Sequence, residues 1–98
     1  MKYLKTYETY LPVEVNDYVI ATSWSMIKDE AEFINNTIGQ IDRIIGDDVS
    51  IKYDSKLLKK YNIQFANNRI ILSKGQIKHV SKNKEDLEIF LNTKKYNL

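Results

Sequence analysis

Alternation of hydrophobic and polar residues predicts several short β-strands in this chain. The pattern is clearest at residues 49–53, where Val49, Ile51 and Tyr53 share one face, which we expect to lie in the core. Four more short apolar segments predict strands at residues 13–21, 39–45, 69–72 and 77–80. The first is entered through a turn at Asn16-Asp17, and Gly46-Asp47-Asp48 predicts a hairpin between the second and third strands.

Apolar residues at helical spacing predict two helices. Ile27, Ala31 and Ile34 indicate a short helix over residues 25–36. Asn83 is a typical N-cap for a terminal helix over residues 83–95, whose buried stripe we expect to be Leu87, Phe90 and Leu91.

Two further segments have weaker helical signals. Ser73 followed three residues later by Gln76 predicts a capping box around a single helical turn. Residues 56–61 fit either a helical turn or a loop.

This order of elements predicts a mainly β fold with added helices, in one domain. We expect a small SH3-like antiparallel barrel, with a helix inserted after the first strand and a helix at the C-terminus. The parts are a leader over residues 1–12, the barrel over 13–81 and the helix over 83–95. The predicted core residues are Val19, Ile41, Ile51, Ile70 and Ile77.

Three segments carry a resemblance to a known fold. Val15-Asn16-Asp17-Tyr18-Val19-Ile20, Ile38-Gly39-Gln40-Ile41 and Val49-Ser50-Ile51-Lys52-Tyr53 resemble the first three strands of SH3-like domains. Ser73-Lys74-Gly75-Gln76-Ile77 and the segment from His79 to Leu87 are similar to the ends of small SH3-like barrel proteins of unknown function found in phages. The resemblance covers residues 13–92 and implies a binding module, because such barrels bind peptides, nucleic acids and other proteins.

Composition indicates the cellular compartment of the protein and the kind of genome that encodes it. The chain has no cysteine, which is compatible with a reducing compartment, and no apolar run as long as a signal peptide or a membrane span. We therefore expect a cytoplasmic protein without membrane contact. Ile, Lys, Asn and Tyr make up 42 of the 98 residues, which suggests an AT-rich bacterial or phage genome and, for a phage protein, the host cytoplasm.

Charge is divided between the two halves of the chain. Residues 1–48 hold four Lys/Arg against nine Asp/Glu, a net charge of −5, whereas residues 49–98 hold eleven against four, a net charge of +7. Nine cations and one acid, Asp54, lie between Lys52 and Lys84. Charge distribution affects the choice of partner more than the overall +2 does.

The basic segment supplies most of the candidate binding residues. Its lysines and aromatic side chains could contact phosphate or an acidic protein face, or they could simply keep a small domain soluble. The candidate contacts are Lys52, Lys56, Lys59, Lys60, Tyr61, Arg69, Lys74, Lys78 and Lys82.

Two other features are candidates for partner contact. Trp24 follows a predicted strand where apolar periodicity does not require it, so it either contacts a partner or covers one open end of the barrel. Asp29, Glu30 and Glu32 form an acidic face that suits a partner with a basic channel. We expect this face to lie apart from a continuous basic surface formed by Lys56, Lys59, Lys60, Lys74, Lys78 and Lys82.

The sequence contains no recognisable catalytic, cofactor-binding or metal-binding motif. His79 is the only histidine and is expected at the solvent face of a strand, while Asp47 and Asp48 are explained by their turn. We therefore expect a non-enzymatic module without a cofactor or metal. The leading hypothesis is a phage accessory protein that docks on a host protein or ribonucleoprotein, for example as an inhibitor of CRISPR or another defence system. The alternatives are a nucleic-acid-binding domain that uses residues 52–84, and a structural subunit of a virion or oligomer.

Overall fold

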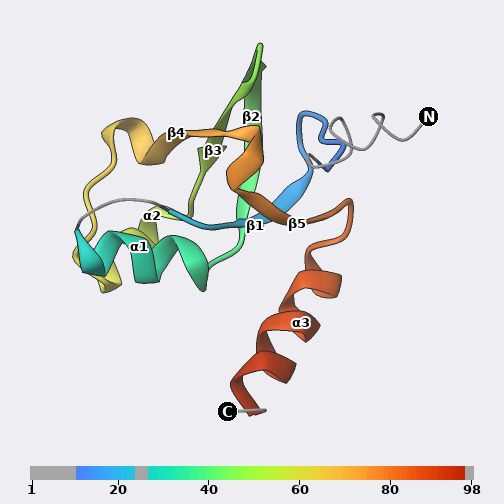
Figure 1. The fold of residues 1–98 in the computed structure, drawn as a ribbon. Coiled ribbons are helices and arrows are strands. Elements are labelled where there is room, and N and C mark those ends of the chain that lie inside the picture. The colour runs from blue at the N-terminus through green and yellow to red at the C-terminus, as the bar shows by residue number, and fades with distance from the viewer. Residues whose placement is uncertain (1–10, 24–26, 97–98) are drawn as a thin grey trace.

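In the part of the chain that the structure describes, a five-stranded antiparallel sheet forms the centre of the fold (Figure 1). The computed structural model describes residues 11–23 and 27–96. Among the described residues the strands lie in the order β4-β3-β2-β1-β5, so that β4 and β5 are the edge strands. The predicted antiparallel sheet with added helices is confirmed, but the sheet is open rather than closed into a barrel. Their bounds are β1 Tyr18–Ala21, β2 Gly39–Ile45, β3 Asp48–Lys52, β4 Arg69–Ser73 and β5 Ile77–Ser81.

The helical elements are inserted between the strands and after them. In Figure 1, α1 and α2 lie at one end of the sheet, while α3 extends away from it. Their bounds are α1 Lys28–Asn35, α2 Ser55–Lys60 and α3 Lys84–Tyr96, with short 3₁₀ turns η2 at Ala66–Asn68 and η3 at Lys74–Gln76. None of the helices within the described ranges has the length and apolar character needed to span a membrane.

The inward face predicted for β3 is confirmed, although Ser50 on the opposite face is buried as well. Val49, Ile51 and Tyr53 are buried, and Ile51 lies between Ile41 of β2 and Ile70 of β4 in the sheet register. Turn residues Gly46 and Asp47 join β2 to β3, and Gly46 has the positive φ of 58° that such a turn requires.

Most of the predicted core is confirmed. Val19, Ile41, Ile51 and Ile77 are buried, whereas Ile70 is half-buried and packs against them. The core also contains Phe33 and Ile34 of α1 and Leu58 of α2. Strands and helices therefore bury apolar surface together, and this burial stabilises the fold.

Local capping signals also predict their elements correctly. At η3, Ser73 Oγ accepts a hydrogen bond from Gly75 N, and Gln76 Oε1 accepts one from Ser73 N at 3.0 Å, which completes the capping box. At α3, Asn83 Oδ1 accepts a hydrogen bond from Glu85 N at 3.1 Å.

Two element boundaries differ from the prediction. The first strand begins at Tyr18 rather than at residue 13, because the predicted turn at Asn16-Asp17 comes directly before it: Asp17 N donates to Glu14 O, and Asn16 has a φ of 78°. Helix α1 begins at Lys28 rather than at residue 25, and residues 24–26 lie outside the described ranges.

The predicted packing of α3 is correct only for its first turn. Leu87 is buried and Leu91 is half-buried, but Phe90 is 36% exposed. The ring of Phe90 lies against that of His79, with centroids 4.0 Å apart, so the half-buried His79 contacts the helix rather than solvent alone. Figure 1 shows that α3 extends away from the sheet, so its later residues have less of the sheet to pack against.

Candidate functional site

A groove runs between α1 and the segment that follows α2. Its larger part is a hollow of about 540 Å³ lined by Asp29, Glu32, Phe33, Asn36, Thr37, Lys60, Tyr61 and Asn62. A second hollow of about 470 Å³ shares Asp29 and Asn62 with the first and continues to Gln64. Because the two hollows share these residues, we treat them as one feature and call it the α1–α2 groove.

Helix α1 provides the acidic wall of the groove. Asp29 and Glu30 lie in its first turn, where carboxylates interact favourably with the helix dipole. Asp29 and Glu32 are exposed, whereas Phe33 and Ile34 are buried in the core. Asp29, Glu32 and Phe33 are spaced by three and four residues, so they lie on one face of the helix. The exposed carboxylates are at the mouth of the groove and the buried Phe33 is at its base.

Helix α2 and the residues after it provide the opposite wall. Asp54 Oδ1 accepts a hydrogen bond from Lys56 N at 2.9 Å, and this N-cap begins the helix. Lys59 and Lys60 occupy the last turn, where cations interact favourably with the helix dipole. Asn62, two residues after the end of α2, adopts a φ of 58°, a conformation that asparagine tolerates better than most residues.

Aromatic side chains form the floor of the groove. The centroid of the Phe33 ring lies 5.2 Å from that of Tyr53, 5.9 Å from that of Tyr61 and 6.3 Å from that of Phe65. Phe33 and Tyr53 are buried, but Tyr61 is 54% exposed. The groove therefore presents an aromatic surface that is supported from below by packed rings.

The predicted separation of acidic and basic residues is wrong at this groove. Lys60 lines the same hollow as Asp29 and Glu32, and its Nζ lies 5.4 Å from the centroid of the Tyr61 ring. Hydrophobic packing brings these charges together. Leu58 of α2 and Ile63 after it are buried in the same core as residues of α1, so the charged side chains of both segments lie at one groove.

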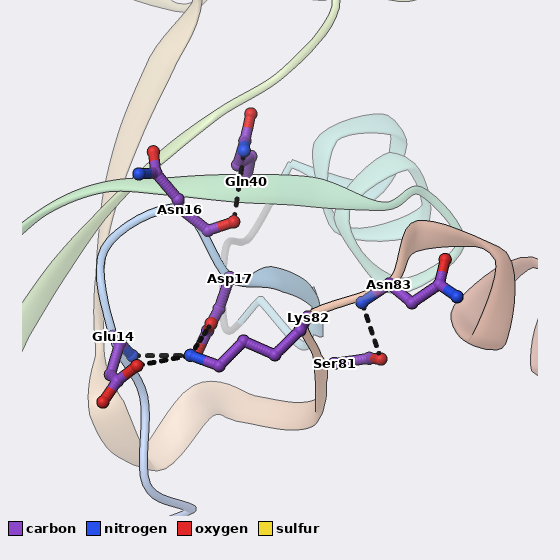
Figure 2. Close-up of polar contacts among 7 residues, drawn as sticks. All are labelled: Glu14, Asn16, Asp17, Gln40, Ser81, Lys82 and Asn83. Carbon is purple, nitrogen blue, oxygen red and sulfur yellow. Dashed lines mark hydrogen bonds and ion pairs between the residues drawn. The ribbon is translucent and has the colours of Figure 1, made fainter.

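Lys82 is also paired with acidic residues (Figure 2). Its Nζ lies 2.7 Å from Asp17 Oδ1 and forms a second ion pair with Glu14. Asp17 is buried, and its Oδ2 accepts a hydrogen bond from Glu14 N at 2.8 Å. The hydrogen bonds to Asp17 and Glu14 raise the pKa of Lys82 above its ordinary value.

The other predicted cations are distributed over several elements. Arg69 of β4 pairs with Asp42 of β2, with Arg69 Nε 2.5 Å from Asp42 Oδ2, and Lys52 lies opposite Arg69 in the sheet register. Lys56 and Lys59 are exposed on α2, Lys74 is half-buried in η3, and Lys78 is exposed on β5.

The groove combines predicted residues with residues that the sequence analysis missed. It brings together Asp29, Glu32, Lys60 and Tyr61, which had been assigned to separate surfaces. Phe33 was missed because it is outside the predicted apolar stripe of α1, although an aromatic residue four positions after Asp29 was an available signal. Trp24 lies outside the described residues.

The part of the chain that the structure describes contains no recognisable metal-binding site. Within these residues, no three His, Asp or Glu side chains are grouped as metal ligands would be. Comparisons of the chain with protein-family models, with curated proteins and with solved structures found no match.

Proposed function

We propose that this chain is a non-enzymatic binding module that docks on another protein through the α1–α2 groove. The strand order β4-β3-β2-β1-β5, in which β5 follows the one-turn η3 and pairs with β1, supports the assignment to small SH3-like barrels, although the sheet of the described residues is open between β4 and β5. In the setting that composition suggests, the module is a cytoplasmic phage accessory protein. Its partner is a host protein or ribonucleoprotein, and inhibition of CRISPR or another defence system is one such role.

The observation that carries this proposal is the half-exposed aromatic ring of Tyr61 in a hollow of about 540 Å³. Tyrosine is enriched among the residues that dominate binding energy at protein interfaces, because it combines a large apolar area with few rotatable bonds. The Phe33 ring that packs against Tyr61 reduces the conformational entropy that Tyr61 loses when a partner binds.

Nucleic acid is a less favourable partner for this surface. Asp29 and Glu32 at the groove repel phosphate, and Lys60 lies among them. Elsewhere, Lys82 and Arg69 already pair with carboxylates, which reduces the positive field that a phosphate backbone requires.

Affinity capture from cells that carry the gene tests this proposal. The wild-type protein is expected to retain a specific protein partner after nuclease treatment. Tyr61→Ala is expected to weaken that complex by about 2 kcal/mol or more, as truncation of an interface hot spot does. Ile71→Ala is the matched control, because Ile71 is 60% exposed on β4 and does not line the groove.

Two results would contradict the proposal. Loss of all captured material after nuclease treatment would assign the surface to nucleic acid. Equal capture by wild type and Tyr61→Ala would show that the partner docks outside the groove.

A further inference from the structure

The α1–α2 groove has the chemistry of a site for one kind of side chain. We infer that it receives an arginine side chain from an extended segment of the partner protein, with the guanidinium between the Tyr61 ring and the carboxylates of Asp29 and Glu32. This inference rests on the proposed docking function and specifies the ligand of that surface.

The aromatic surface favours a cation. The electron-rich face of a tyrosine ring attracts a cation within about 6 Å of its centroid. In the free protein, Lys60 Nζ already lies 5.4 Å from the Tyr61 centroid. Lys60 is the chain neighbour of Tyr61, so an incoming cation would share the ring with this ammonium group or displace it.

The carboxylates favour the same ligand. Among the residues that the structure describes, Asp29 and Glu32 line the larger hollow together with one cation, Lys60, so acidic groups outnumber basic groups there. Glu30 lines the second hollow and adds a further negative charge. An incoming cation is therefore attracted by charge complementarity, and Lys60 competes with it.

Arginine fits this arrangement better than lysine. The guanidinium group is planar, so it can stack on an aromatic ring while its N–H groups donate to carboxylates at its edge. It is also more weakly hydrated than an ammonium group, which lowers the cost of leaving water.

The length of the groove favours a peptide segment over a free small molecule. Beyond the larger hollow, the second one continues past Asn62 to Gln64. Asparagine and glutamine side chains carry both donors and acceptors for a peptide backbone. A segment extending from the arginine can therefore occupy this second part of the groove.

A pair of end-blocked peptides tests the inference by NMR titration of the full chain. One is Gly-Gly-Arg-Gly-Gly and the other carries citrulline, a neutral analogue of the same shape, at the central position. We expect saturable shifts at Tyr61 and Gln64 with the arginine peptide, and at least tenfold weaker binding of the citrulline peptide. End-blocked arginine alone is expected to shift Tyr61 but not Gln64.

Charge variants provide a second readout. Combined Asp29→Asn and Glu32→Gln substitutions are expected to weaken binding of the arginine peptide about tenfold, because both carboxylate partners lose their charge. Lys60→Gln is expected to strengthen binding about threefold, because the competing cation is removed. Lys59→Gln is the matched control on the exposed side of α2 and should leave the affinity unchanged.

Equal binding of the two peptides, or weaker binding after Lys60→Gln, would overturn the inference. If the captured partner still depends on Tyr61 in that case, the docking proposal stands and its ligand is not arginine. If the arginine peptide binds in the groove but no captured partner depends on Tyr61, the guanidinium site stands and the docking proposal is wrong.

Discussion

Ile51→Ala is expected to destabilise the protein by about 2–5 kcal/mol, the range for truncating a buried isoleucine. Ile51 is fully buried in β3, with Ile41 and Ile70 beside it on neighbouring strands. The substitution removes buried apolar area and leaves a cavity that these strands cannot close without shifting. A domain of this size has a total stability of about 5–15 kcal/mol, so the loss is a large fraction of it.

Urea and thermal unfolding of the wild type and the variant measure this effect. A loss of this size lowers the melting temperature by roughly 8 °C or more. Ile71→Ala on β4 makes the same kind of truncation at a side chain that is 60% exposed, and it should change stability by less than about 0.5 kcal/mol. Similar melting curves for Ile51→Ala and wild type would show that the sheet core is wrongly described.

Gly39→Ala is expected to destabilise the protein by about 1–3 kcal/mol, although alanine is only one methyl group larger. A Cβ atom at this buried position would collide with Ile51 Cγ2 and would lie 2.9 Å from Cε1 of the Tyr53 ring. Both neighbours are themselves buried, so neither can move away without disturbing the core.

A double-mutant cycle with Ile51→Ala separates this collision from other causes. Ile51→Ala removes the Cγ2 atom that the new methyl group would meet, so Gly39→Ala should cost less in that background than in the wild type. Strictly additive free energies of unfolding would show that the close approach of Gly39 to Ile51 is not the source of the effect.

The sequence predicted the elements whose signals are local. Alternation from Val49 to Tyr53 and the turn at Gly46-Asp47 identify the hairpin, since both depend on residues that are adjacent in the chain. Ser73 with Gln76, and Asn83, likewise identify helix starts from side chains within three residues of the backbone they cap.

The candidate site depends on contacts between residues that are far apart in the sequence, so local sequence patterns could not predict it. Whether α2 forms was ambiguous because it is only six residues long, and its Asp54 cap was not recognised. Its position beside α1 follows from the packing of Phe33 with Tyr61, which lie on separate segments of the chain. Asp17 and Lys82, separated by 65 residues, meet because the neighbouring strands β1 and β5 pair in the sheet.

The central claim is that a partner protein occupies the α1–α2 groove, and site-specific photo-cross-linking tests it most directly. The substitution Gln64→p-benzoylphenylalanine places a photoreactive group at the exposed rim of the groove without altering Tyr61. The matched probe is Ile71→p-benzoylphenylalanine, at an exposed position on β4. Irradiation of the captured complex is expected to join the partner to the protein from position 64 and not from position 71. An adduct from position 71, with none from position 64, would contradict the account.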